Sequence, residues 1–298
     1  MEKRRLGKTD MNVSVLGLGG AEIGFEKAKQ EEVTRLLESA FDGGLNVIDT
    51  ANAYLTSEEM IGKAVSYRRK DFLLFTKCGT TDGFARADWS RAGILRHIEQ
   101  SLRRLRTDYL DLIQLHSCGA RVLRKGDVIE ALQAARDKGL ARYIGYSGDG
   151  RNAVYAIKLG VFDTLQTSIN IADQKGIDLL LPLARAKNMG VIAKRPIANA
   201  VWRHSRKPPN PYHHVYWRRI NKLQYEFLKG DLSQSVGIAL RFTLSQPGVH
   251  TAIVGTTKPG RWSENARLLE AGPLPAADIE RICQRWRKVA NFTWVGQV

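Results

Sequence analysis

The chain has 298 residues, of which 43% are hydrophobic and 26% charged, enough apolar material for a sizeable core. Its 46 Lys and Arg residues against 30 Asp and Glu give a net charge of +16, so the charge alone leaves nucleic acid, membrane surfaces and anionic small molecules as partner classes. The charged N-terminus lacks an apolar signal region and no stretch approaches the roughly 20 apolar residues of a membrane span, so we expect a soluble cytoplasmic protein without a membrane partner.

The length suits one large domain, because α/β barrels commonly run about 250 residues as a single unit. No linker or fixed-period repeat divides residues 1–298, and we predict a single domain. Cys78, Cys118 and Cys283 are too few and too scattered for a disulfide framework or a metal site. Basic residues are spread along the chain without a helix-turn-helix, RNP or zinc-finger pattern, so no nucleic-acid partner is expected.

Residues 4–10 and 12–15 resemble two short strands around a polar turn, and we expect this hairpin to close the floor of a barrel. Residues 16–20 then end the first barrel strand, where the glycines, including Gly20, permit close approach of a ligand or tight packing. The first helix follows, with apolar residues at helical spacing and a stop at Gly43 and Gly44: Val33, Leu36, Leu37, Ala40 and Phe41.

The second strand, residues 46–49, runs directly into Asp49, and a short loop carrying Tyr54 follows it. Thr56 and Glu59 have the spacing of a capping box and predict the start of the next helix. A tyrosine with a pKa of about 10 is a poor proton donor near neutrality, so its use as a general acid requires a nearby cation that stabilises the phenolate.

Two further apolar strands end in candidate partners: residues 72–77 end at Lys77, and residues 109–116 end at His116. If the strands are parallel, both side chains gather with Asp49 and Tyr54 at one mouth. Lys77 would then lower the Tyr54 pKa and pair with Asp49, while His116 would hydrogen-bond a substrate carbonyl oxygen. Taken singly, each residue has a structural explanation as a cap, a solvated strand end, a core histidine or a loop aromatic. Their occurrence in order, each just past an apolar strand, favours catalysis.

The alternation continues to the end of the chain and predicts right-handed parallel βα units, eight of which close a TIM barrel. We expect strands at 141–147, 162–168, 190–194 and 251–254, and helices at 94–105, 128–135, from about 151, 177–187, 233–244 and from Pro259. Residues 276–290 predict an extra helix outside the barrel. Residues 148–153 match the G-x-G-x-x-A dinucleotide fingerprint, but this motif belongs at the first βα turn and here follows the fifth strand, so we interpret the match as coincidental.

Residues 198–231 form a long insertion after the seventh strand, in which aromatic and basic side chains alternate. Long loops at this face of a barrel usually shape substrate access, and the arginines, such as Arg203 and Arg206, favour carboxylate- or phosphate-bearing substrates. The same composition is compatible with a grip on single-stranded nucleic acid, the less favoured alternative.

The motifs together resemble the aldo-keto reductase family. The resemblance rests on DTANAY followed by SEEMIGKA, on TKCG, on LIQLHS and on the segment Gly255–Asn265, and it covers nearly the whole chain. It implies a TIM barrel that reduces a small aldehyde or ketone with NADPH, and Asp49, Tyr54, Lys77 and His116 match the catalytic residues of the family. Two alternatives stay open: a non-catalytic cofactor-binding accessory subunit on the same fold, and a basic nucleic-acid-binding protein.

The resemblance also implies cofactor contacts near the reacting centre, with Asp49 and Gly20 at the same mouth. Ser147 matches the serine of a Ser-Asn pair that contacts the nicotinamide carboxamide, whereas Gly148 replaces the asparagine. Gln166 matches a glutamine at the end of strand six. The segment with Lys194 and Arg195 matches the position after strand seven, where many members place a tyrosine that stacks on the nicotinamide.

At the other end of the cofactor, Thr256 and Arg261 match a serine and an arginine that bind the adenosine 2′-phosphate, which implies NADPH in preference to NADH. Adenine contacts match Glu264 and Asn265. Gly255 departs from members that carry a lysine there, and we expect Lys258 to replace that cation. A helix start in this segment also suits a phosphate, because its free N–H groups carry partial positive charge.

Overall fold

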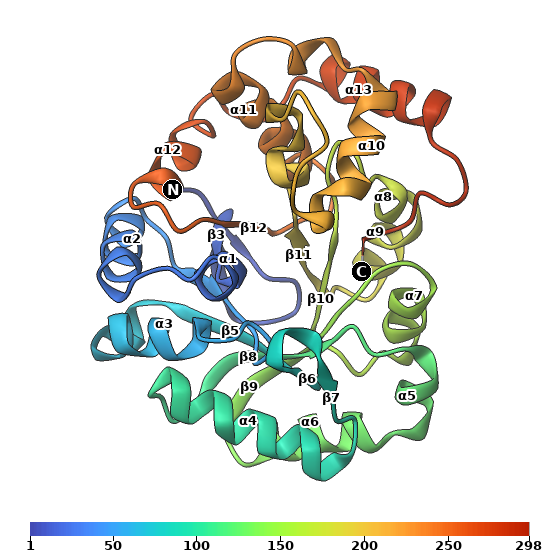
Figure 1. The fold of residues 1–298 in the computed structure, drawn as a ribbon. Helices are drawn as coiled ribbons and strands as arrows, with labels where there is room; N and C mark the ends of the chain where they lie inside the picture. Colours follow the sequence, from blue (N-terminus) through green and yellow to red (C-terminus); the bar gives the residue numbers. More distant parts are fainter. Residues whose placement is uncertain (298) are drawn as a thin grey trace.

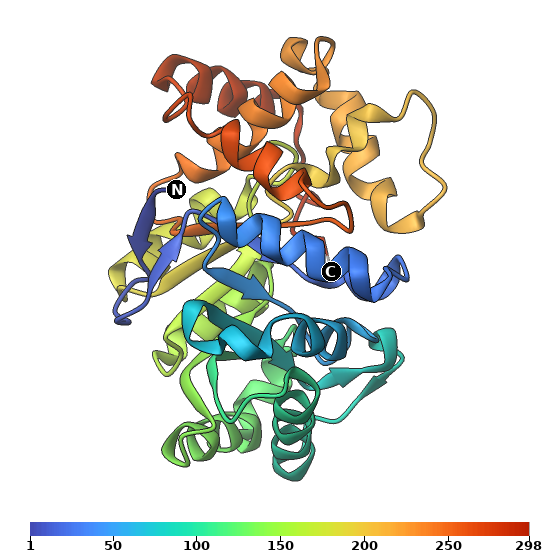
Figure 2. The same ribbon diagram turned by 90° about the vertical axis from the view of Figure 1, so that its left-hand side faces the viewer.

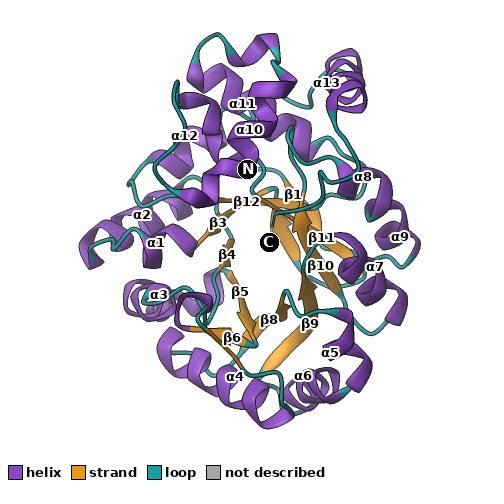
Figure 3. Cartoon of the chain, turned by 45° about the vertical axis from the view of Figure 1, so that its right-hand side comes forward, coloured by secondary structure: helices purple, strands orange, loops and turns teal. Residues whose placement is uncertain are grey.

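The computed structural model of the chain describes residues 1–297, and its centre is a closed barrel of parallel strands (Figures 1 and 3). Neighbouring strands follow the order β10-β11-β12-β3-β4-β5-β8-β9 around the ring. Their bounds are β3 Leu16–Gly19, β4 Val47–Asp49, β5 Leu73–Cys78, β8 Leu110–His116, β9 Ala141–Ser147, β10 Thr164–Ser168, β11 Gly190–Lys194 and β12 Thr251–Gly255. The predicted (β/α)8 TIM barrel is confirmed.

Helices surround the barrel, and most of them bury their apolar faces against it (Figure 3). They are α1 Ala21–Phe25, α2 Gln30–Asp42, α3 Ser57–Val65, α4 Arg91–Leu105, α5 Ala120–Lys125, α6 Asp127–Asp137, α7 Gly150–Leu159, α8 Lys175–Leu179, α9 Leu181–Ala186, α10 His214–Leu223, α11 Leu232–Leu244, α12 Arg261–Arg267 and α13 Ala276–Val289. In α2 the buried side chains are those whose spacing predicts the helix: Val33, Leu36, Leu37 and Ala40. No helix in residues 1–297 combines the length and apolarity needed to cross a lipid bilayer.

An antiparallel hairpin of β1 Lys3–Arg5 and β2 Asn12–Ser14 covers the end of the barrel opposite the strand carboxyl ends, and Figure 2 shows it in dark blue at the left edge. Leu6, Met11 and Val13 are buried in one cluster with barrel-strand side chains, among them Phe75. The hairpin therefore closes the floor, as predicted, and leaves the opposite mouth for ligands.

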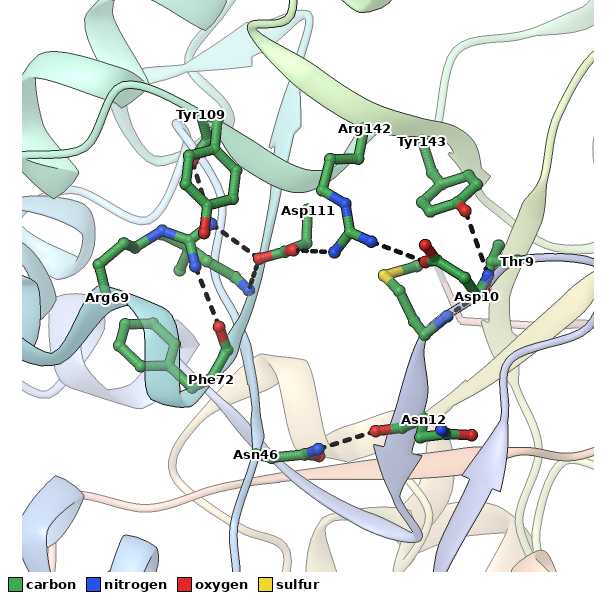
Figure 4. A network of polar contacts seen from close by, with 12 residues as sticks. Thr9, Asp10, Asn12, Asn46, Arg69, Phe72, Tyr109, Asp111, Arg142 and Tyr143 are labelled. Carbon is green, nitrogen blue, oxygen red and sulfur yellow. Dashed lines mark hydrogen bonds and ion pairs between the residues drawn. The ribbon is translucent and has the colours of Figure 1, made fainter.

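A polar network joins the hairpin to the barrel near this floor (Figure 4). The buried Asp111 accepts hydrogen bonds from Arg69 and Arg142, both at 2.7 Å, and from the backbone N–H of Leu74 at 2.9 Å. Arg142 also pairs with Asp10 of the hairpin turn at 2.7 Å. One carboxylate thus ties β5, β8, β9 and the hairpin together.

The predicted insertion 198–231 is more ordered than a loop, because 22 of its 34 residues form α10 and short 3-10 turns. Its Tyr216 and Leu223 are buried in a second apolar cluster with Trp286 of α13 and Trp294 of the terminal segment. Figure 1 shows α10, α11 and α13 gathered on one side of the barrel. The extra C-terminal helix is confirmed, and it packs on the insertion.

Three local predictions are wrong. Thr56 has helical backbone angles (φ −86°, ψ −2°), its side chain makes no capping bond, and Glu59 pairs with Lys63 instead, because a capping residue needs an extended backbone. The helix expected over 177–187 breaks at Leu180, since Pro182 cannot donate a helical hydrogen bond. The helix expected from Pro259 begins at Arg261, after Gly260 in a left-handed conformation.

Candidate active site

Three strands end with the side chains that the sequence predicts at the mouth. Asp49 is the last residue of β4 and His116 the last of β8, while Lys77 precedes the last residue of β5. Tyr54 lies in the turn between β4 and α3, where its carbonyl accepts a hydrogen bond from the N–H of Ser57 at 2.9 Å. Because all the barrel strands are parallel, the four side chains lie at one end of the barrel.

An ion pair lies at the centre of this group. Lys77 and Asp49 are both 1% exposed, and the Lys77 ammonium contacts Asp49 Oδ1. Lys77 Nζ also donates to the backbone carbonyl of Thr50 at 2.8 Å. Burial lowers the pKa of Lys77, and the neighbouring Asp49 carboxylate acts in the opposite direction. The carboxylate therefore holds the ammonium in a place where an unpaired charge would be expensive.

Two glutamines fix the other oxygen of Asp49. Oδ2 accepts hydrogen bonds from Gln166 Nε2 at 2.8 Å and from Gln114 Nε2 at 3.2 Å. The Ser147 hydroxyl in turn donates to Gln166 Oε1 at 3.1 Å. Sequence reasoning assigned Ser147 and Gln166 only to the cofactor and missed Gln114, whose place inside LIQLH, two residues before His116, is the available signal. All three orient the ion pair.

His116 faces Tyr54 across the mouth. The ring centroids are 5.5 Å apart with planes at 77°, and Thr80 Oγ1 lies 3.2 Å from His116 Nδ1. Burial lowers the pKa of His116 well below 6.5, and Lys77, Lys194 and Arg195 lower it further. The imidazole is therefore neutral near pH 7, with Nδ1 engaged and Nε2 left for a ligand.

The predicted lowering of the Tyr54 pKa by Lys77 is wrong. Burial raises the pKa of Tyr54 well above 10, the Asp49 carboxylate raises it further, and Arg195 is the cation that opposes this shift. The Lys77 ammonium lies 5.1 Å from the centre of the Tyr54 ring, but its charge is already balanced by Asp49. Tyr54 thus keeps its proton at neutral pH.

Two further aromatic residues border the site and were missed. The Phe84 ring lies 4.9 Å from His116 and 6.2 Å from Tyr54, and Phe25 lies 5.8 Å from Tyr54. Phe84 sits in a turn between β6 Thr80–Thr81 and β7 Arg86–Ala87, where Asp82, Gly83 and Phe84 all have positive φ (50°, 63° and 73°). The Asp-Gly pair in TTDGFA is a hairpin signal that could have revealed this element.

A cleft of about 510 Å³ opens from Asp49 and Tyr54 along the barrel mouth to α12, while Lys77 and His116 do not line it. Most of the predicted cofactor residues line it: Gly20, Asp49, Gln166, Lys194, Arg195, Thr256, Lys258, Arg261, Glu264 and Asn265. Ser147 and Gly148 do not. Ser147 is buried beneath Gln166, and a side chain at Gly148 would collide with the Tyr146 ring, whose atoms lie 2.6–2.9 Å from the Cβ position. An asparagine at 148 is therefore incompatible with this packing.

Lys194 and Arg195 are both committed to internal contacts. Lys194 Nζ lies 3.0 Å from the buried carboxylate of Asp149, which also accepts a hydrogen bond from the N–H of Ser168 at 2.7 Å. Arg195 donates to the Ser168 hydroxyl at 2.8 Å and to the Gln297 carbonyl at 2.6 Å. The segment Gly148–Gly150 thus presents Asp149 to neighbouring strands, which supports a coincidental match to the dinucleotide fingerprint.

At the far end of the cleft, Arg261 and Glu264 are paired at 2.9 Å and each is 49% exposed. Thr256 Oγ1 accepts a hydrogen bond from the N–H of Lys258 at 3.1 Å. Gly255, where the resemblance leads one to expect a lysine, is faced by the carboxylate of Glu22. Glu22, which was not predicted as a site residue, therefore places an acidic group where the resemblance leads one to expect a cation.

The comparisons with known proteins agree with this geometry. A model of the Aldo/keto reductase family matches residues 15–287. The chain belongs to this family. The uncharacterized oxidoreductase YqkF of Bacillus subtilis (strain 168) is 30% identical over 95% of both chains, and L-galactose dehydrogenase of Arabidopsis thaliana is 26% identical over 99% of this chain and 97% of its own. The holo form of aldo-keto reductase AKR11C1 from Bacillus halodurans superposes with a TM-score of 0.82 at 28% identity, covering 98% and 99% of the two chains.

The cleft of this aldo-keto reductase fits a phosphate-bearing dinucleotide. Its volume lies within the usual range for ligand pockets, roughly 300–1,000 Å³. Arg203, Lys258 and Arg261 supply positive charge along it. Asn199 Nδ2 is buried in the wall without a hydrogen-bond partner among residues 1–297, in a run where Ala198, Asn199 and Ala200 all have positive φ. Orphaned donors and strained backbone of this kind cluster at ligand sites.

The insertion contributes less charge to the cleft than its sequence suggests. Of its basic residues, Arg203 and His213 line the cleft, whereas Arg219 is buried, where it lies 3.4 Å from Asp173 and donates to the Val295 carbonyl at 2.6 Å. Part of the basic pattern in this aldo-keto reductase therefore stabilises the second apolar cluster.

Proposed function

We propose that the protein is an NADPH-dependent oxidoreductase that reduces an aldehyde or ketone to an alcohol, reversibly, with Tyr54 as the proton donor. The observation that carries this proposal is the convergence of Tyr54, His116 and the Lys77–Asp49 pair where Tyr54 and Asp49 line the end of a cleft suited to a dinucleotide. Bound NADPH supplies the hydride to the carbonyl carbon.

The chain's own residues hold and protonate the carbonyl oxygen. His116, neutral at physiological pH, donates a hydrogen bond from Nε2 to this oxygen and orients it toward Tyr54. The Tyr54 hydroxyl gives its proton to the oxygen as negative charge develops there. Its raised pKa ensures that the proton is present beforehand, and Arg195 offsets the phenolate charge that remains.

The remaining proposed contacts follow the cleft. Gly20, Gln166, Lys194 and Arg195 lie at the reacting end, and Asp49 and Ser147 hold Gln166 in place. Thr256, Lys258, Arg261, Glu264 and Asn265 lie at the other end, where a 2′-phosphate and adenine would bind. Gly148 lies outside the cleft lining and is not proposed as a contact.

Consumption of NADPH against a panel of aldehydes, ketones and quinones tests this function. We expect turnover of at least one class that disappears in Tyr54→Phe. An accessory subunit would instead bind NADPH and consume none with any carbonyl compound. If the protein did not bind NADPH at all, both the reductase and the accessory-subunit hypotheses would be overturned.

A further inference from the structure

Glu22 is a cleft residue that the proposed mechanism does not use. It lies in the first turn of α1, directly after β3, and lines the cleft together with Gly20 and Gly255. Among the residues that the structure describes, its carboxylate forms no hydrogen bond or ion pair with another side chain. A half-buried acid without a cation partner is unusual, because burial of an isolated charge is costly.

The packing at Gly255 fixes the place of this carboxylate. A Cβ atom built on Gly255 would lie 1.6 Å from Glu22 Oε2 and 2.2 Å from Cδ, so the carboxyl group occupies the space of the missing side chain. Gly255 ends β12 and leads into Thr256 and Lys258. The acid is therefore held on the wall of the cleft, between the reacting end and the 2′-phosphate end.

The charged groups around Glu22 come from several elements. Glu26 is the C-cap of α1, and Arg195 follows β11. From the insertion, Tyr212, His213 and Arg203 line the same cleft, and Tyr54 lies at its reacting end. The cleft cations that follow Gly255 in the chain are Lys258 and Arg261, the second of which already pairs with Glu264.

These surroundings favour the neutral acid. Burial raises the pKa of Glu22 to about 7, Glu26 raises it further, and Arg195 acts in the opposite direction. Tyr54 is uncharged at this pH because its own pKa is raised. A dinucleotide brings the negative charges of its diphosphate into the cleft, which disfavours an ionised carboxylate on the cleft wall still more.

We propose that Glu22 is a cofactor-binding residue that accommodates the dinucleotide only as a neutral carboxylic acid, so that cofactor binding takes up one proton from solvent onto the Glu22 carboxyl group. This inference rests on the proposed NADPH function. Cofactor affinity then depends on the protonation state of Glu22: the neutral acid donates a hydrogen bond within the cleft, whereas the carboxylate repels the diphosphate.

Linkage sets the direction of the pH effect. Bound cofactor raises the pKa of Glu22 above its value in the free protein, so the bound state holds more protons than the free state above about pH 7. Affinity is then constant below that pH and falls by up to about tenfold per pH unit above it. The 2′-phosphate of NADPH, with a pKa of about 6, is already ionised in this range and contributes no opposing change.

Calorimetry of NADPH binding at pH 8 in buffers of different protonation enthalpy measures the proton uptake directly. We expect uptake approaching one proton in the wild-type chain and none in Glu22→Gln, which mimics the neutral acid and should bind NADPH more tightly at pH 8. Glu26→Gln is the matched control, since it removes an exposed acid from the C-terminal end of the same helix and should retain the uptake.

The outcomes separate the two proposals. The role of Glu22 would be overturned if the wild-type chain took up almost no proton on NADPH binding, or if Glu22→Gln took up as many protons as the wild type. Loss of NADPH binding in a folded Glu22→Gln chain would overturn it as well. Proton uptake by the wild-type chain tests the role of Glu22 even if Glu22→Gln fails to fold. Absence of NADPH binding at pH 6.5 would instead overturn the proposed function, because the neutral acid is then in excess.

Discussion

The Lys77 ammonium and the Asp49 carboxylate contact each other inside the barrel, where both side chains are 1% exposed. Such a pair contributes little net stability, because the cost of removing two charges from water rivals their attraction. Its value is local: Asp49 keeps a cation beside the Tyr54 ring, and the two glutamines on its other oxygen prevent rotation of the carboxylate.

Tyr54→Phe should abolish carbonyl reduction and leave NADPH affinity nearly unchanged, since it removes the proton donor and little else. General acid catalysis contributes about a hundredfold to ten-thousandfold, so the rate constant should fall by that factor. Steady-state kinetics and a fluorescence titration measure the two effects. Tyr143→Phe, which loses a hydroxyl at the barrel floor, is the control. Retention of more than about a tenth of the wild-type rate would remove Tyr54 from this role.

Lys77→Met should lower both activity and stability, because it leaves Asp49 buried without its cation. Loss of one partner of a buried pair costs about 3–5 kcal/mol, and the two glutamine hydrogen bonds should hold the loss near the lower value. Urea unfolding measures this difference. The double variant Asp49→Asn with Lys77→Met should regain most of the stability and none of the activity. A Lys77→Met chain as stable as the wild type would contradict this account.

The sequence predicted the barrel because its strands and helices have clear periodicity and short connections. The catalytic candidates could be found for the same reason: Asp49, Lys77 and His116 mark the ends of apolar strands. Their partners could not. Gln114 and Asp149 resemble ordinary strand and turn residues, and only the closed barrel brings them to Asp49 and Lys194.

The pKa shifts of the site residues could not be predicted from the sequence either. The direction of the Tyr54 pKa depends on how completely Asp49 balances Lys77 and on how much water the surrounding chain excludes. The insertion was predicted as a loop because its mixed aromatic and basic residues lack a simple period, yet Tyr216 and Arg219 gain partners in Asp173 and the terminal segment. Such contacts join residues far apart in the chain.

Lowering the pH should destabilise the fold through His116. Its pKa is well below 6.5 in the folded chain, so the unfolded chain binds the proton more readily, and stability is lost progressively as the pH falls below about 6.5. Denaturant unfolding between pH 7.5 and 5 should show this decline, and His116→Gln should show less of it. His97, His213 and His250, whose pKa values are also lowered, are present in both proteins and cancel in the comparison. Identical slopes would exclude the contribution of His116.

Asp111→Ala should destabilise the barrel floor without changing the active site. The carboxylate is 2% exposed and accepts from Arg69, Arg142 and the backbone N–H of Leu74 (Figure 4), so its loss removes the buried anion beside two cations and leaves a buried N–H without its acceptor. A cost of about 3–5 kcal/mol is expected from unfolding measurements. Asp10→Ala, which removes an exposed partner of Arg142, should cost at most about 1 kcal/mol. KM for the carbonyl substrate should be unchanged in both variants.

Arg261→Ala should weaken NADPH binding and leave NADH binding nearly unaffected. Arg261 lies at the first position of α12 and lines the end of the cleft, where it is half exposed and held by Glu264 at 2.9 Å. A charged hydrogen bond to the 2′-phosphate contributes roughly 1.5–3 kcal/mol, which corresponds to about a tenfold to hundredfold change in the dissociation constant.

The exposure of Arg261 and its competition with Glu264 place the expected effect near the lower end of that range, because solvent screens exposed charges. Lys258→Ala is the matched variant, since its ammonium is the other cation at this end of the cleft. If both residues bind the phosphate, each substitution should reduce the preference for NADPH over NADH. Fluorescence titration with the two cofactors measures the four dissociation constants. Equal losses for NADPH and NADH in Arg261→Ala would mean that this side chain supports the helix start and does not contact the phosphate.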